Sequence, residues 1–255
     1  SVFNGTEALA MGTVIGSNIS NIALIFGVSC IGVSMRPAKT NLVQFIPFAI
    51  AAIILGLVLL DLKITVIEGW VLLIIFALFI FITYQYRGSE VDDQIEESAT
   101  GTITILLYLT VGLLALIGGS NFAVIHAEKI AYVLNVPQLI IGLTIIALGT
   151  SLPELAATIS AIMKNKNDMV IGNVIGSNVM NIALVLPIIG FFSNTSFDST
   201  VLSRDYFVML IATILFVLLA ATYSSNKINL KFIRFVGCIF VAGYFGYILN
   251  LSNLI

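Results

Sequence analysis

Charged side chains are scarce in this sequence. Only 9% of its 255 residues are Asp, Glu, Lys or Arg, whereas 59% are hydrophobic. A soluble domain carries about 25% charged residues, because it must cover its surface with groups that water solvates. The shortage therefore excludes a soluble globular fold. The net charge of −2 also gives no basis for a nucleic-acid partner, which requires a clustered positive surface.

Histidine and cysteine are also rare, which limits the available chemistry. Cys30 and Cys238 lie inside apolar runs and are expected to be small buried residues, not a disulfide or a metal pair. The one histidine, His126, ends an apolar run and is expected at the membrane interface. No H-E-x-x-H, G-x-S-x-G or Asp-rich motif occurs. The sequence thus predicts neither an enzyme nor a resident cofactor.

Long hydrophobic runs dominate the chain instead. About 20 apolar residues cross a bilayer as a helix, and the alternating polarity of a membrane β-barrel is absent. The sequence therefore predicts an all-α, multi-pass integral membrane protein. Eight runs qualify: Gly12–Met35, Leu42–Leu60, Trp70–Tyr86, Thr102–Ile125, Ile130–Met163, Met169–Phe192, Tyr206–Ser225 and Phe235–Leu254.

The basic residues between these runs predict the orientation. Counting the loops alternately, eight Lys and Arg fall on one side of the membrane and three on the other. The positive-inside rule places the richer side, with the loops at Met35–Asn41, Arg87–Gly101, Lys164–Asp168 and Ser224–Lys231, in the cytoplasm. Loops this short, with no soluble domain, suggest a prokaryotic plasma membrane.

Two segments of the sequence are copies of each other. GTVIGSNISNIAL, Gly12–Leu24, and GNVIGSNVMNIAL, Gly172–Leu184, are identical at ten of thirteen positions, at a constant offset of 160 residues. The second copy lies five runs after the first, so it crosses the membrane in the opposite direction. This predicts an inverted-repeat transporter with halves at residues 1–86 and 102–255, joined by an acidic cytoplasmic linker at residues 87–101.

The offset also predicts a counterpart for the segment before the second copy. Subtracting 160 from the number of Glu154 gives a position before Ser1. We therefore expect the first half to start inside its second helix, so that an N-terminal segment is missing from this sequence. A chain of this extent alone is expected to transport poorly or not at all.

Glu154 is expected to be the only ionisable residue deep inside a hydrophobic run. A charge there costs about 3 kcal/mol and by default marks an ion or proton pathway. Pro153 lacks an N–H and opens the preceding turn, so that carbonyls such as that of Ala147 can face a cavity. Thr150 and Ser151 lie four and three residues before Glu154, on the same helical face.

Oxygen atoms of these kinds suit a hard cation such as Ca²⁺ or Na⁺. The alternative is a proline-kinked helix in which the hydroxyls bond to the backbone and the Glu154 carboxyl is protonated.

Polar side chains within each repeat copy share one helical face. They are spaced i, i+4 and so point the same way: Ser17 with Asn21, and Ser177 with Asn181. Asn18 and Asn178 lie off that face and are predicted to form structural hydrogen bonds between helices.

The two motifs together resemble a known family. GTSLPE at Gly149–Glu154, followed by GNVIGSNVMN at Gly172–Asn181, is similar to the second α-repeat of the cation/Ca²⁺ antiporter superfamily, and most similar to the prokaryotic sodium/calcium exchangers. The likeness covers the whole chain. It implies a bundle of normally ten helices, of which about eight remain here beside an N-terminal remnant, with ion sites between two glutamates.

The resemblance also implies a role for each matching residue. Glu154 would ligate both Ca²⁺ and Na⁺, joined by Thr150 and the Ala147 carbonyl. The others would be Ser177 at an outer Na⁺ site, Ser17 at an inner one, Ser151 at the repeat boundary, and Asn21 and Asn181 in the middle. Some relatives carry Asp where Asn181 stands, which leaves H⁺ as counter-ion open.

The predicted function is exchange of Ca²⁺ for Na⁺ by alternating access, with the two ions competing for the same oxygens. The first alternative is a Ca²⁺/H⁺ or other divalent-cation/H⁺ antiporter of the same fold. A membrane-embedded enzyme with Glu154 as acid or base, and a purely structural membrane subunit, are the alternatives from other classes.

Overall fold

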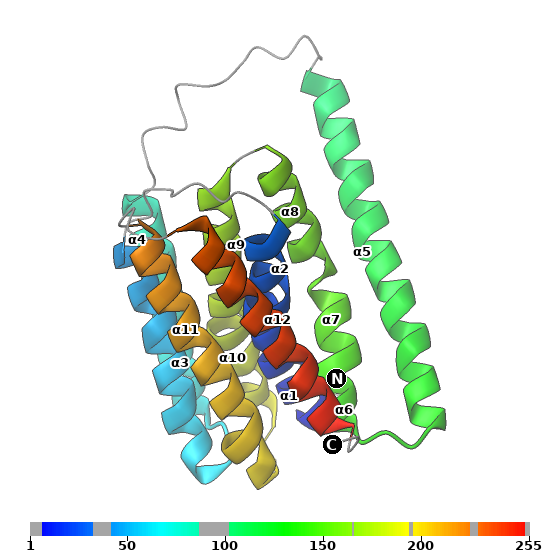
Figure 1. Cartoon of the computed structure of the whole chain (residues 1–255). Helices are drawn as coiled ribbons and strands as arrows, with labels where there is room; N and C mark the ends of the chain where they lie inside the picture. The colour runs from blue at the N-terminus through cyan, green and yellow to red at the C-terminus, as the bar shows by residue number, and fades with distance from the viewer. Residues whose placement is uncertain are drawn as a thin grey trace.

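The structure is a computed structural model, and it describes residues 7–32, 42–86, 102–164, 166–193, 196–224 and 229–252. Within these ranges every regular element is a helix. Eight described helical spans are long and apolar enough to cross a membrane (Figure 1), which confirms the prediction of an all-α, multi-pass membrane protein. The linker predicted at residues 87–101 lies outside the described residues.

Five spans are helices without an interruption near the centre. They are α3 (Phe45–Val58), α4 (Val66–Gln85), α5 (Thr102–Val133), α11 (Phe207–Ser224) and α12 (Leu230–Leu251). A π-helical segment, η8 (Val201–Tyr206), leads into α11. The capping box of Thr65 and Glu68 fixes the start of α4, because each side chain satisfies a backbone N–H of the first turn.

The other three spans are interrupted, and all three lie where the sequence places the polar motifs. The first consists of α1 (Glu7–Ile19), the π-helical η2 (Ser20–Phe26) and α2 (Gly27–Gly32). The fifth consists of α6 (Gln138–Ile141), the π-helical η6 (Gly142–Ile146), α7 (Ala147–Thr150) and α8 (Leu152–Met163). The sixth consists of α9 (Asn167–Met180), the π-helical η7 (Asn181–Val185) and α10 (Leu186–Phe192). Such π-helical insertions often mark functional sites.

The boundary between the fourth and fifth spans differs from the prediction. The sequence divides the chain between Ile125 and Ile130, but α5 continues unbroken to Val133. Helix-forming residues fill that gap, and the break comes only at Asn135, which adopts a left-handed φ of 55°, shortly before Pro137. His126 and Lys129 therefore belong to α5 and not to a loop.

The two repeat copies run in opposite directions through the bundle. In Figure 1 the span from α1 to α2 rises from the bottom of the view, whereas the span from α9 to α10 descends from the top. The prediction of an inverted repeat is thus confirmed. Both copies widen into a π-helix at nearly equivalent places. η2 begins at Ser20, and η7 begins at Asn181, one residue after Met180, which is the position related to Ser20 by the offset of 160 residues.

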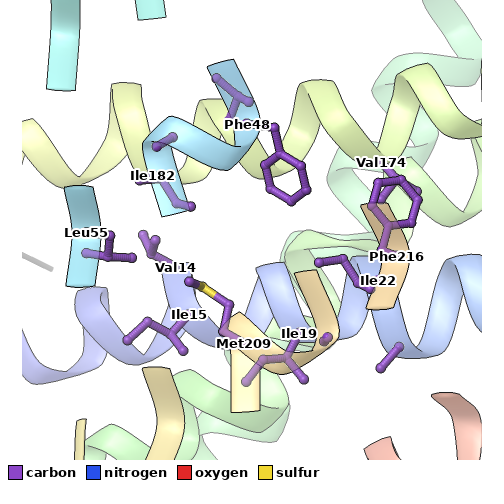
Figure 2. Packing of buried hydrophobic residues seen from close by; sticks show 14 of the residues in the cluster. Val14, Ile15, Ile19, Ile22, Phe48, Leu55, Val174, Ile182, Met209 and Phe216 are labelled. Carbon is purple, nitrogen blue, oxygen red and sulfur yellow. The ribbon is translucent and has the colours of Figure 1, made fainter. Parts of the chain in front are cut away.

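The first span is the centre of the bundle. In its most apolar stretch 83% of the residues are buried, against 6% for α5, which stands at the edge of the bundle in Figure 1. Figure 2 shows side chains of this first span packed among those of α3, α9, η7 and α11. The labelled residues are Val14, Ile15, Ile19, Ile22, Phe48, Leu55, Val174, Ile182, Met209 and Phe216. The exposed apolar side chains of α5 suit contact with lipid.

Glycines allow the backbone of the first span to lie in direct contact with the backbone of the fifth. A Cβ added to Gly16 would lie 2.5 Å from the carbonyl oxygen of Leu143, and one added to Gly12 would lie 2.6 Å from that of Leu139. Small residues permit such close helix contacts in membranes. The contact brings Ser17, the neighbour of Gly16, against the segment that carries the GTSLPE motif.

We therefore predict that Gly16→Ala destabilises the protein. The methyl group would overlap the backbone of η6, and overpacking of this kind costs about 1–3 kcal/mol of unfolding free energy. For a chain of this size the melting temperature falls by about 2–4 °C per kcal/mol, which thermal unfolding in detergent measures. Gly246→Ala is the matched control, because a Cβ at Gly246 of α12 meets nothing within 4 Å. Equal melting temperatures for the two variants would contradict the close contact.

Candidate cation-binding site

The fifth span breaks where the sequence predicts an opened turn. α7 ends at Thr150 and α8 begins at Leu152, with Pro153 in its first turn. The Ser151 N–H between them donates to the carbonyls of Ala147, at 3.2 Å, and Leu148, at 3.1 Å. The Ala147 carbonyl thus keeps a backbone donor, and the Thr150 hydroxyl also lies within hydrogen-bond distance of it, at 3.2 Å.

Hydroxyls from both halves meet at this break. The Ser17 and Thr150 hydroxyl oxygens lie 3.1 Å apart, and Ser17 Oγ also donates to the Ala147 carbonyl at 3.4 Å. The Ser20 and Ser151 hydroxyl oxygens likewise lie 3.1 Å apart. Ser17, Thr150, Ser151 and the Ala147 carbonyl, which the sequence nominates as ligands, therefore lie together in the structure.

Asn21 of the first repeat copy bonds to Ser177 of the second copy. Its side-chain N–H donates to Ser177 Oγ at 3.1 Å, and Ser177 Oγ in turn donates to the Asn173 carbonyl at 2.8 Å. These bonds orient the Asn21 amide, and its oxygen Oδ1 is buried without a hydrogen-bond partner among the residues that the structure describes. A buried acceptor of this kind is costly unless something else satisfies it.

Asn181 makes a different contact from Asn21. Its amide donates to Asn18 Oδ1 at 3.3 Å, and Asn18 donates to Met209 Sδ at 3.6 Å. The prediction that Asn18 bridges helices is confirmed. The prediction for Asn178 is wrong for the described part of the chain, because its amide bonds back to the Val174 carbonyl of its own helix, as Asn side chains do where no polar group faces them.

Two carboxylates with buried oxygens, Asp205 and Glu154, differ in how the protein satisfies them. Asp205, which sequence reasoning missed because it precedes its apolar run, is fully buried, but Arg204 and Tyr247 satisfy it: Arg204 Nε donates at 2.7 Å and the Tyr247 hydroxyl at 2.9 Å. Glu154 differs, since its Oε2 is buried without any hydrogen-bond partner in the described residues. A carboxylate in that position requires a proton or a cation.

Asn173 is a further polar residue at the site, and sequence reasoning did not assign it a role. Its side-chain N–H₂ group donates to the Glu154 carbonyl and to Thr158 Oγ1, both at 2.9 Å. Asn173 thereby joins α9 to the first turn of α8 and fixes the backbone that carries the Glu154 carboxyl. The sequence feature that could have indicated a role is the difference between the two copies at this position, where the second copy has Asn173 and the first has Thr13.

A cavity of about 640 Å³ opens beside the break. Its lining includes Thr150 and Pro153 from the break, and Asn121, Glu128 and Tyr132 from α5. Polar side chains of α5 thus share a cavity with the break in the fifth span.

Two inverted halves, with unsatisfied buried oxygens where they meet, define the class of secondary transporters that bind cations near the membrane midplane. The model of the family described as sodium/calcium exchanger protein matches residues 1–85 and 104–252. The chain belongs to the sodium/calcium exchanger protein family, and it is a cation/Ca²⁺ antiporter of that family.

Named relatives and a solved structure agree with this membership. The putative antiporter CaxA of Alkalimonas amylolytica is 34% identical over 96% of this chain and 79% of the relative. The sodium/calcium exchanger MaX1 of Methanosarcina acetivorans is 40% identical, over 45% of this chain and 33% of its own length. The solved sodium-calcium exchanger NCX_Mj superposes with a TM-score of 0.74 at 29% identity, covering 96% of this chain and 76% of that protein.

We predict that Asn173→Ala weakens Ca²⁺ binding about 3- to 10-fold, because two hydrogen bonds that position Glu154 are lost and each contributes about 0.5–1.5 kcal/mol. Equilibrium binding of ⁴⁵Ca²⁺ measures the change. Thr158→Val removes one acceptor of Asn173 but leaves the bond to Glu154, so its effect should be smaller. A Thr158→Val effect equal to or larger than that of Asn173→Ala would show that the bond to Glu154 is not the one that matters.

Proposed function

We propose that this chain exchanges Ca²⁺ for Na⁺ across the membrane, with Glu154 as the central ligand. The observation that carries the proposal is that two buried oxygens, Glu154 Oε2 and Asn21 Oδ1, have no hydrogen-bond partner among the residues that the structure describes. Carbonyl, hydroxyl and carboxylate oxygens are the donors that hard cations take. The proposed ligands are Glu154, Thr150, Ser151 and the Ala147 carbonyl from the broken span, and Ser177, Asn181, Ser17 and Asn21 from the repeat copies.

The two cations would share these oxygens and so exclude each other. Glu154 supplies one negative charge, and the other proposed ligands are neutral, so Na⁺ and Ca²⁺ would compete for the same carboxylate. Competition of this kind couples the two fluxes, because the protein would change the side to which the site is open only when one cation or the other is bound. The names of the relatives MaX1 and NCX_Mj, both called sodium/calcium exchangers, support this assignment.

Access would alternate between the two sides of the membrane. The lining of the cavity beside Thr150 includes Glu128 and Tyr132 near the C-terminal end of α5, and the distribution of Lys and Arg assigns that end to the exterior. Transport would then require this cavity to close and an opening towards the opposite side to form. The proposal includes a plasma-membrane location in a prokaryote, supported by relatives from bacteria and archaea, and transport without an enzymatic step.

Exchange of Ca²⁺ for H⁺ is the second candidate. Glu154 favours it in one respect, since a buried carboxyl can take a proton as well as a cation. Asn181, by contrast, has no titratable group, so Glu154 would carry the proton without help from that position.

The choice of counter-ion is tested with the full-length protein in liposomes. We expect an outward Na⁺ gradient at constant pH to drive ⁴⁵Ca²⁺ uptake, and a pH gradient without Na⁺ to drive little, because the neutral oxygens around Glu154 can coordinate Na⁺ but cannot take up a proton at physiological pH. Uptake that follows only the pH gradient would replace the proposal by the H⁺ alternative.

We predict that Glu154→Gln lowers Ca²⁺ affinity at least about 100-fold, since the substitution keeps the shape of the side chain and removes its charge from a site with little water. Titration of bound ⁴⁵Ca²⁺ on the purified full-length protein measures the loss. Glu68→Gln is the matched control, because glutamine can still form the capping box with Thr65 and Glu68 lies at the start of α4. Undiminished affinity in Glu154→Gln would remove Glu154 from the site.

A further inference from the structure

Ser20 lies beside the site without belonging to the polar pairs of the repeat. It is the first residue of η2 and is fully buried. Its hydroxyl oxygen lies 3.1 Å from the Ser17 carbonyl and 3.1 Å from Ser151 Oγ. It therefore links the first repeat to the residue at which the fifth span breaks.

The protons of this chain of oxygens can be placed by counting donors. A carbonyl oxygen only accepts, so the Ser20 proton must lie on the bond to the Ser17 carbonyl. The contact between Ser20 and Ser151 then needs its proton from Ser151, because two oxygens at 3.1 Å without a proton between them would repel. The arrangement that satisfies both contacts is Ser151 donating to Ser20, and Ser20 donating to the Ser17 carbonyl.

When Ser151 donates its proton to Ser20, the Ser151 oxygen can coordinate a cation. Its proton is held on the side of Ser20, and its lone pairs remain free. Ser20 is also the sole hydroxyl bonded to Ser151 Oγ within the described ranges. Without Ser20, the Ser151 hydroxyl has no acceptor to fix its proton, and it can rotate towards its own backbone.

We propose that Ser20 is a positioning residue for cation binding, which holds the Ser151 hydroxyl with its lone pairs directed at the ion. The inference rests on the proposed function, because it takes Ser151 as a ligand. Ser20 touches no ion itself and acts through Ser151.

The hydrogen bonds from Ser151 to Ser20 and from Ser20 to the Ser17 carbonyl have no equivalent in the described part of the other half of the protein. The residue related to Ser20 by the repeat offset is Met180, which has no hydroxyl and whose side chain is 46% exposed. Ser20 therefore makes the environment of the two halves chemically unequal at equivalent positions. The effect should fall mainly on Na⁺, whose binding depends more on neutral oxygens, whereas Ca²⁺ is held chiefly by the charge of Glu154.

A double-mutant cycle on the full-length protein tests the role. Na⁺ affinity is measured as the Na⁺ concentration that displaces half of the bound ⁴⁵Ca²⁺, for the wild type, Ser20→Ala, Ser151→Ala and the double variant. We expect Ser20→Ala to raise this concentration about 3- to 10-fold, as for one hydrogen bond, and Ca²⁺ affinity to change less than about 2-fold. In the Ser151→Ala background, Ser20→Ala should add nothing, because the two residues act as one unit.

Ser29→Ala is the matched control. Ser29 is buried in the same span, and its hydroxyl bonds to the Ile25 carbonyl of its own helix turn at 2.7 Å, so its loss should leave Na⁺ displacement unchanged. The Ser20 role is overturned if Ser20→Ala behaves like Ser29→Ala, if it weakens both cations equally, or if its effect multiplies with that of Ser151→Ala. A wild-type protein from which Na⁺ displaces no Ca²⁺ would overturn the proposed function itself, and the Ser20 role with it.

Discussion

A carboxylate in the hydrocarbon layer must be neutralised or solvated by something other than water, and the arrangement around Glu154 follows from that constraint. Asn173 donates to the backbone carbonyl of Glu154, but no salt bridge to the Glu154 carboxylate occurs in the described part of the chain. Asp205 shows the contrast, since Arg204 and Tyr247 satisfy that carboxylate completely. Asp205 is thus paired within the fold, whereas Glu154 Oε2 has no hydrogen-bond partner among the described residues, which is the reason we propose it as a cation ligand.

Close packing of backbones makes this arrangement possible. Gly12 and Gly16 allow the first span to lie directly against η6, so that short side chains such as Ser17 and Ser20 reach the break at Ser151. A hydroxyl extends only a few ångströms from its backbone, and a Cβ at either glycine would overlap the backbone of the fifth span. The glycines therefore allow hydroxyls from two distant parts of the sequence to come into contact.

The internal repeat is symmetric in its backbone but not in its chemistry. The two copies cross the bundle in opposite directions, and each widens into a π-helix at a nearly equivalent position. Their polar side chains differ, however, since Asn173 holds the Glu154 backbone whereas Thr13 bonds to its own helix, at the Leu9 carbonyl. The two copies thus share the course of their backbone but differ in the hydrogen bonds that their side chains make.

The sequence by itself determined the membrane class, the eight spans and the inverted repeat, because each follows from local composition or from a constant offset between two copies. The role of Glu154 stays a prediction. The sequence did not determine the end of the fourth span, because the residues from Ile125 to Ile130 carry no signal that α5 continues to Val133. Only the tertiary structure decided that Asn21 reaches Ser177 while Asn181 reaches Asn18, that Asp205 is buried, and that Ser20 bonds to Ser151. Those facts depend on which backbones approach one another, and that distance is set by packing between segments more than 100 residues apart in the chain, which no local pattern records.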